Sequence, residues 1–232
     1  MKNALLLFIA FMIIACGEKQ HDLTVKGQIK GLKKGTIYLK KANDSALISI
    51  DSLTINGDSE FELHSNLKSP EVLFLYLDKN SSEKDRIRFF ADKGITEINT
   101  SLKNFAFDAE INGSTQQKTL EEYEKMMSRF KDQNLNLIKE KFEALKANNK
   151  SKLDSLENIQ NSMQKRQYLF TVNFALNHKD SEVAPYLALT EIYNAKINLL
   201  DTINKSLSVK VKNSKYGKEL QEFIDKINES EK

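Results

Sequence analysis

The sequence predicts an α+β protein, in which an N-terminal antiparallel β-sandwich is followed by a helical domain packed against it. From Asp22 to Gly113 apolar and polar residues alternate, and six of the eight glycines interrupt this pattern, as turn-rich antiparallel strands require. After Gly113 the apolar residues recur at helical spacing and turn signals become rare. We therefore expect a sandwich over residues 22–113 and a helical domain over residues 114–232.

Composition narrows the classes of function. The chain has 232 residues, of which 40% are hydrophobic and 29% are charged, so it can build a globular core. Its formal net charge of +3 is spread without a dense Lys/Arg block, which excludes nucleic-acid binding driven by a basic face. With one cysteine, an internal disulfide, a Cys-rich zinc site and a C-x-x-C redox pair are excluded as well.

The N-terminus has the pattern of a processing signal. Lys2 is followed by an unbroken apolar run from Ala4 to Ile14, and then by Ala15 and Cys16. A run of this length is too short to cross about 30 Å of hydrocarbon as a helix. Residues 1–15 are therefore predicted to be a signal peptide.

The end of this segment, Ile13-Ile14-Ala15-Cys16, resembles the lipobox of bacterial lipoproteins. The resemblance implies cleavage between Ala15 and Cys16, diacylglycerol transfer to the Cys16 sulfur and acylation of the new amino terminus. The membrane would then be a partner through acylated Cys16, with residues 16–21 as a short polar tether. The tether lacks an acidic cluster, so we expect an outer-membrane lipoprotein that faces the periplasm. The alternative is a plain secretory signal with an incidental cysteine.

Period-two alternation and turn residues locate about eight strands. They are expected around Leu23–Lys30, Ile37–Leu39, Ile48–Leu53, Phe61–Leu63, Val72–Leu77, Ile87–Phe90, Ile95–Thr100 and Phe105–Ile111. Asn56-Gly57 lies between two of these strands and predicts a hairpin, because both positions tolerate positive φ. The six consecutive apolar residues of Val72–Leu77 predict a central strand that is covered on both faces.

Four helices are expected in the second half of the chain. They run from Ser114 or Thr115 to Asn148-Asn149, from Ser151 to Asn177-His178, from Ser181 and Pro185 through Ile197, and from Tyr216 to Ile227. The first carries an apolar stripe made of Leu120, Tyr123, Met127, Phe130, Leu137, Ile138, Phe142 and Leu145. Each stripe needs a partner, so the helices should pack on one another and on the sandwich. Because no linker separates Ile111 from Ser114, the two regions should form one rigid unit.

Several segments together resemble a known family. These are Leu23–Leu32, Gly35–Lys40, Ile50-Asp51-Ser52 and Phe61–Leu63, which are similar to the N-terminal domain of unknown function (4369-like) of Bacteroidetes-type lipoproteins. In that family a helical segment and a thioredoxin-like domain of the TlpA/ResA kind follow. Ser181–Tyr186 and Asn213–Lys218 are similar to segments found just before that domain.

The resemblance does not imply the family's redox chemistry for this chain. The chain reaches Lys232 without a C-x-x-C motif, so no residue corresponds to the disulfide reductase site. What remains is the non-catalytic part of the architecture. A chain truncated before a thioredoxin-like domain would have the same sequence, and this alternative stays open.

Candidate catalytic residues are few. His21, His64 and His178 occur without a metal-binding or general-base pattern, and no G-x-S-x-G or phosphate-binding glycine loop is present, so no cofactor, metal or catalytic residue is assigned. The carboxylates Glu121, Glu122 and Glu124 lie in a lysine-rich helix, where i, i+4 pairing is the ordinary explanation.

The helical half is rich in aromatic residues, which we expect mostly in the core, with any exposed ones forming a partner or ligand patch. They are Tyr123, Phe130, Phe142, Tyr168, Phe170, Phe174, Tyr186, Tyr193, Tyr216 and Phe223. The expected function is a non-enzymatic, lipid-anchored envelope protein with a binding or scaffolding role. Its partner is expected to be a thioredoxin-like lipoprotein or another envelope protein. The first alternative is an accessory that docks with a separate thioredoxin-like disulfide reductase. The second is a hydrolase with an unrecognised site.

Overall fold

A computed structural model describes residues 21–43, 46–78 and 86–230. The strands are β1 (Leu23–Lys30), β2 (Lys34–Asn43), β3 (Ala46–Asn56), β4 (Glu60–Ser65), β5 (Glu71–Leu77), β6 (Ile87–Ala91), β7 (Gly94–Ser101) and β8 (Glu110–Asn112). The helices are α1 (Thr115–Lys146), α2 (Lys150–Asn177), α3 (Val183–Glu191), α4 (Ile197–Ser206), α5 (Val209–Lys212) and α6 (Lys215–Ser230). The signal peptide, Ala15, Cys16 and most of the tether lie outside the described residues.

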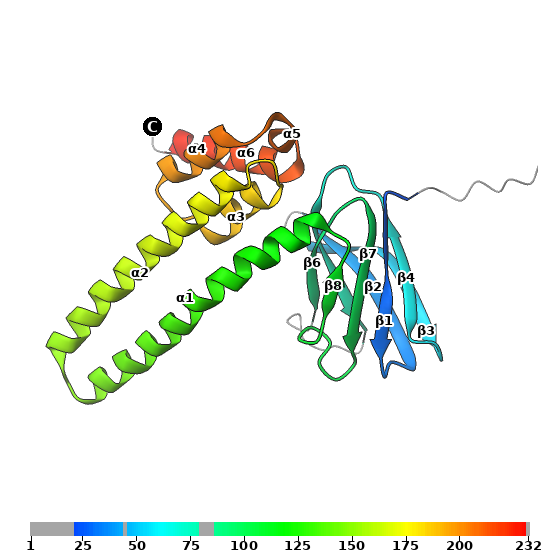
Figure 1. The fold of residues 1–232 in the computed structure, drawn as a ribbon, viewed down its shortest axis with the longest axis horizontal. Coiled ribbons are helices and arrows are strands. Elements are labelled where there is room, and N and C mark those ends of the chain that lie inside the picture. The colour runs from blue at the N-terminus through cyan, green and yellow to red at the C-terminus, as the bar shows by residue number, and fades with distance from the viewer. Residues whose placement is uncertain (1–20, 44–45, 79–85, 231–232) are drawn as a thin grey trace, which may run out of the picture.

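The predicted α+β architecture is confirmed (Figure 1). Two four-stranded sheets have the orders β4-β1-β7-β8 and β3-β2-β5-β6. All neighbouring strands pair antiparallel except β1 and β7, which run parallel with Leu23 opposite Gly94. This exception arises because the chain between them passes through the other sheet, and a long crossover permits parallel pairing.

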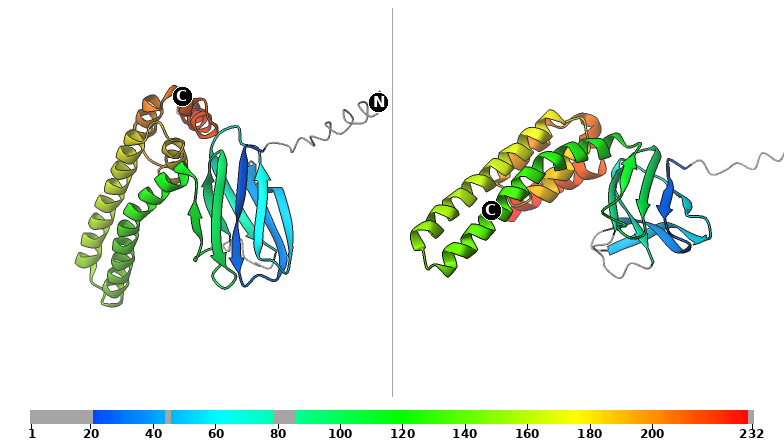
Figure 2. Two further views of the ribbon diagram at one scale, coloured as in Figure 1. Left: turned by 45° about the vertical axis from the view of Figure 1, so that its right-hand side comes forward. Right: turned by 60° about the horizontal axis from the view of Figure 1, so that its bottom comes forward.

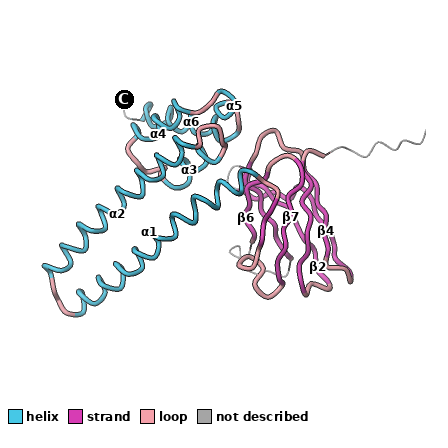
Figure 3. Tube along the Cα trace, in the orientation of Figure 1, coloured by secondary structure: helices cyan, strands magenta, loops and turns pink. Residues whose placement is uncertain are grey.

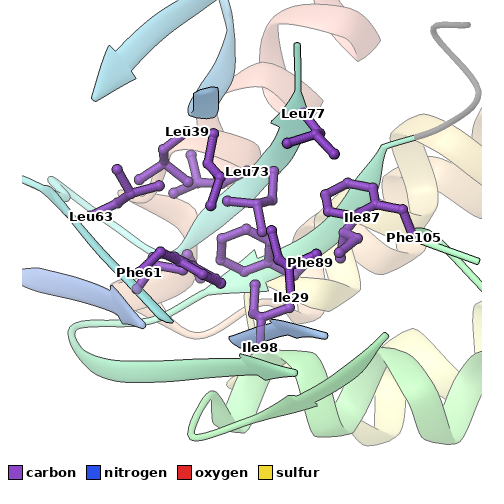
Figure 4. Close-up of a cluster of buried hydrophobic side chains, with 14 of the residues drawn as sticks. Ile29, Leu39, Phe61, Leu63, Leu73, Leu77, Ile87, Phe89, Ile98 and Phe105 are labelled. Atoms are coloured by element: carbon purple, nitrogen blue, oxygen red, sulfur yellow. The ribbon is translucent and has the colours of Figure 1, made fainter. Parts of the chain in front are cut away.

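The sandwich core lies between the two sheets (Figure 4). Inward side chains of β1, β2, β4, β5, β6 and β7 fill it, as period-two alternation predicts. Its fully buried members include Ile29, Leu39, Leu63, Leu73 and Phe89. The strands from both halves of residues 22–113 are therefore required for one common core.

The hairpin predicted at Asn56-Gly57 is wrong in its pairing. Gly57 does make a turn with φ +110°, but β3 pairs with β2 and β4 pairs with β1, so the turn carries the chain from one sheet to the other. The Gly57 N–H bonds to the Lys33 carbonyl rather than across a two-residue hairpin. The dipeptide therefore predicted the turn correctly but not which strands would pair.

The strand predicted over Phe105–Ile111 is also wrong, since only Glu110–Asn112 forms β8. The preceding residues form a turn held by the Thr100 hydroxyl, which donates to the Phe105 carbonyl at 2.7 Å. Phe105 is buried in the sandwich core, whereas Phe107 is 92% exposed. The alternating aromatic residues therefore led to the prediction of a strand, whereas local side-chain hydrogen bonds stabilise a turn.

The first two helices agree with their predicted spans, and side chains cap both of them. The Ser114 side chain accepts from the Gln117 N–H, and the Asn149 side chain accepts from the Lys152 N–H. The third predicted helix is wrong beyond Glu191, because the chain turns before α4 begins at Ile197 (Figure 3). Neither α4 nor α5 was predicted as a separate helix.

The helices pack on the sandwich at one end only. Figure 2 shows α1 and α2 as a long antiparallel arm that extends beyond the shorter helices. Near the sandwich, a shared cluster joins Val72 and Phe90 of the sheet to Leu120, Tyr123 and Tyr216 of the helices. Among the described residues, no helix is long and apolar enough to cross a membrane.

Candidate binding cleft

A cleft lies where the outer face of the β2-β5-β6 sheet meets α3 and α6. Its volume is about 720 Å³. It is lined by Lys41, Ala42, Asn43, Asn66, Lys68, Ser69, Glu71, Val72, Phe74, Tyr186, Lys215, Tyr216 and Glu219. Because these residues come from both the sandwich and the helices, the cleft exists only when the two regions are packed together.

Aromatic side chains form the floor of the cleft. Tyr186 and Tyr216 line the cleft, and their rings pack edge to face with each other and with the fully buried Phe90 beneath them, with centroids 5.1 to 5.7 Å apart. The Tyr216 hydroxyl accepts a hydrogen bond from the Val72 N–H at 2.9 Å. Burial raises the pKa of the Tyr216 phenol, so the floor is neutral at ordinary pH.

The rim of the cleft carries charges of both signs. The Lys215 ammonium donates to the Glu71 carboxylate at 2.6 Å, and the Ser69 hydroxyl accepts from the Lys215 backbone N–H at 3.1 Å. Burial raises the pKa of the Glu219 carboxyl, Lys215 opposes this rise, and Glu71 adds to it. Within the described chain, no carboxylate lies at ion-pair distance from Lys41 or Lys68.

Cations and aromatic rings continue from the cleft along the outer face of the sheet. The Lys40 ammonium lies 4.5 Å from the Tyr76 ring centroid, and the Arg86 guanidinium lies 4.6 Å from that of Phe74. Arg86 also donates to the Tyr76 hydroxyl at 2.9 Å. This positive face and the cleft meet at Phe74, so they form one continuous surface suited to anionic groups.

A buried polar network holds α1 and α3 in place behind the cleft. The Gln116 side chain donates to the Glu182 carboxylate at 2.8 Å and accepts from the Ser181 hydroxyl. The Gln116 backbone N–H donates to Asp92 at 3.2 Å. Burial is the main cause that raises the pKa of Glu182, whereas its own backbone N–H and the Lys210 ammonium, 4.0 Å from the carboxylate, oppose the rise.

The predicted histidines lie away from the cleft. His21 and His64 stack with ring centroids 4.9 Å apart at one end of the sandwich, and His178 stacks on Phe174 at the end of α2. No group of three or more metal-ligating side chains occurs among the residues that the structure describes. The histidines therefore contribute nothing to the cleft.

The i, i+4 explanation is wrong for Glu124, which pairs with Arg88 of β6 across the interface. Of the aromatic residues in the helical half, Phe142 and Tyr193 are largely exposed, and the others are buried or half-buried. Most of them therefore lie in the core, as expected.

Sequence reasoning did not identify the cleft itself. Lys41, Lys68, Glu71 and Glu219 are ordinary surface residues in the sequence, and only the fold brings them together. One signal was available, because the two segments that resemble the family, Ser181–Tyr186 and Asn213–Lys218, each contribute a tyrosine to the floor. Because the two segments lie far apart in the sequence, the contact between their tyrosines could not be predicted from it.

A comparison with family models supports the resemblance of the strand region. The model described as a domain of unknown function, DUF4369, matches residues 23–120. Residues 23–120 form a DUF4369 domain. A comparison with curated proteins gave no match.

The DUF4369 domain contains all eight strands and the first turns of α1. The inclusion of these turns has a structural reason, since the Gln117 side chain accepts from the Phe90 N–H at 2.8 Å and Leu120 packs in the shared cluster. The cleft is lined partly by the DUF4369 domain and partly by Tyr186, Lys215, Tyr216 and Glu219, which lie beyond it. It is therefore a composite of the domain and the helices that follow.

Proposed function

We propose that this protein is a lipid-anchored component of the cell envelope that binds a partner without catalysis, and that the cleft holds acidic groups of that partner. The observation that carries this proposal is the composite cleft, in which Lys41 and Lys68 face an aromatic floor. The adjoining positive face with Lys40 and Arg86 adds further cations. Acidic side chains would pair with these cations, and apolar atoms would pack on the tyrosines.

The anchor is proposed at Cys16, on the outer membrane facing the periplasm. Support comes from the lipobox-like Ile13-Ile14-Ala15-Cys16. The mass of the protein purified from its membrane should equal that of a chain that begins at Cys16 and carries three acyl groups. Cys16→Ser should lose the lipid mass and move out of the lipid-anchored fraction. An unmodified Cys16 in the mature protein would refute the anchor.

The cleft is tested by charge reversal combined with crosslinking in cells. A photo-crosslinking residue at position 43, on the rim, should give a discrete protein adduct. Lys41→Glu and Lys68→Glu should each reduce this adduct severalfold, because a negative rim repels acidic groups. The matched control is Lys103→Glu, an exposed lysine that follows the end of β7 and does not line the cleft, which should leave the adduct unchanged. Equal adduct formation in all three variants would refute the proposal.

The absence of catalysis is part of the proposal. It is supported by the chemistry of the cleft, where the Ser69 hydroxyl accepts from a backbone N–H and Lys215 is paired with Glu71. Neither group has the base or free amine that an activated nucleophile needs. The hydrolase alternative would be favoured if the protein hydrolysed ester or glycoside substrates and Glu219→Gln abolished this hydrolysis.

The accessory role beside a thioredoxin-like reductase stays a prediction. With Cys16 acylated the mature chain has no free thiol, so the protein alone should not reduce insulin above the rate in buffer. A separate thioredoxin-like lipoprotein as the crosslinked partner at position 43 would favour this role.

A further inference from the structure

The far half of the α1–α2 arm exposes a row of large apolar side chains. Leu135, Ile138, Phe142 and Leu145 of α1 are 56 to 64% exposed. Their spacing of three, four and three residues places them on one face of the helix, and we call this row the arm stripe. Ile138, Phe142 and Leu145 were expected to pack on a partner, whereas Leu135 was not part of the predicted stripe. None of the described elements covers the four side chains.

The arm stripe is not needed to hold the arm together. Leu137 and Ala144 of α1 pack against Leu156 and Met163 of α2 and form the seam between the two helices. The same segment of α1 therefore carries two apolar rows, one buried in the seam and one facing solvent. A second, uncovered row of four large residues indicates a docking surface.

Lysines surround the arm stripe. Lys131 continues the row one turn before Leu135, and the Lys146 ammonium lies 4.5 Å from the Phe142 ring centroid. Lys141 also lies beside the row, where it donates to Gln160 of α2. The nearby Glu140 is directed to α2, where it pairs with Lys152 at 3.2 Å. The stripe is therefore apolar with basic borders, which is the pattern of helices that lie on anionic membranes.

Two other occupants fit this surface less well. A second copy that paired stripe to stripe would bring lysines against lysines, and four side chains supply much less than the roughly 800 Å² per partner of a stable interface. An amphipathic helix of another protein needs a groove with two apolar walls, but the neighbouring residues of α2 are the exposed Glu157, Gln160 and Asn161. A lipid surface needs no groove, because it deforms around a single row of side chains.

We propose that the arm stripe docks on a membrane surface that contains anionic phospholipid. This inference rests on the proposed function, because a lipid anchor would keep the arm close to a bilayer and raise its effective concentration there. Four apolar side chains alone bind weakly, so the anchor and the stripe act as two signals. Phe142 and its neighbours would enter the headgroup boundary while the lysines contact the phosphates.

The test uses the mature lipidated protein reconstituted in vesicles. Because Cys16 would be acylated, Phe142→Cys introduces the single free thiol, which is labelled with a polarity-sensitive fluorophore. Its emission should shift to the blue in vesicles of phosphatidylethanolamine with phosphatidylglycerol and much less in phosphatidylethanolamine alone. The control is the same label at Phe107→Cys, a still more exposed position on the sandwich, which should show no shift.

Lysine variants test the charge dependence. Lys131→Gln and Lys146→Gln should each lower the docking equilibrium about fivefold, since one lysine near an anionic surface contributes about 1 kcal/mol. Lys226→Gln on α6 is the control and should change nothing. No blue shift in anionic vesicles, or an equal shift without anionic lipid, would overturn the inference. A concentration-dependent shift in detergent, without lipid, would assign the stripe to a second copy and would also overturn it.

Failure of the anchor is measured separately by flotation of the protein with the vesicles. Protein that floats without a blue shift overturns the arm stripe inference and leaves the anchor intact. Protein that does not float overturns both.

Discussion

The hydrogen bond between Tyr216 and Val72 joins the helices to the sandwich and allows a sharp test of their interface. The Val72 backbone N–H donates to the Tyr216 hydroxyl at 2.9 Å in a buried environment, 144 residues apart in sequence. Tyr216→Phe removes one oxygen atom and preserves the ring, which packs against Phe90 and Tyr186. The variant therefore tests the hydrogen bond and little else.

The expected loss of stability comes from the Val72 N–H, which Tyr216→Phe leaves without a partner. Without the hydroxyl, the Val72 N–H has no acceptor in a dry interface, and an unsatisfied buried donor costs about 1 to 3 kcal/mol. With a urea m-value of about 2 kcal/mol/M, the middle of this range lowers the midpoint of unfolding by about 1 M. Because Val72 and Tyr216 belong to one shared cluster, sandwich and helices should unfold in a single transition.

The assay is urea unfolding followed by far-ultraviolet circular dichroism, with hydrogen exchange of β5 amides as a probe of the sandwich. Tyr193→Phe is the matched control, since Tyr193 is 56% exposed and its hydroxyl should contribute less than about 0.5 kcal/mol. Equal midpoints for the two variants would show that the hydrogen bond does not hold the interface. Loss of helix before exchange of β5 would show that the two regions unfold independently.

Three further outcomes are expected. Gly113→Ala should lower the free energy of thermal unfolding by about 3 kcal/mol, because the φ of Gly113 is +100° and a Cβ there would lie 2.1 Å from a backbone oxygen. Gly94→Ala, with φ +110° and open space around the Cβ, should lower it by only about 1 kcal/mol, and similar losses would refute the steric argument. Burial raises the pKa of Glu182, so the folded wild-type protein becomes less stable as the pH rises above the ordinary value of 4.5 and this carboxyl must ionise. Glu182→Gln has no such group, and it should become more stable relative to wild type between pH 4 and pH 7. A difference in the free energy of unfolding that stays constant over this range would contradict this. Limited proteolysis should spare residues 112–115, and early cleavage there into two stable fragments would show that sandwich and helices are separate bodies.

The sequence by itself determined the local features of this protein. Alternation and turn glycines were sufficient for most of the strands, although not for the one expected over Phe105–Ile111, and helical spacing with Ser114 as a cap was sufficient for α1. The start of α2 was predicted at Ser151, and its cap is Asn149. These features depend on neighbours within a few residues, which any sequence displays directly. The segments that resemble the DUF4369 family also lie within single strands or turns and could be recognised without a structure.

Only the tertiary structure decided which strands pair and which surfaces remain open. The turn at Gly57 is compatible with a hairpin or a change of sheet, and the choice depends on core contacts between distant strands. The spacing of Phe142 and Tyr123 on α1 is equally helical, yet Tyr123 is buried against the sheet while Phe142 lies beyond the reach of the shorter helices. The cleft likewise requires Lys68 and Tyr216 to meet across an interface, because burial and electrostatic fields depend on distances in space, which sequence spacing does not record.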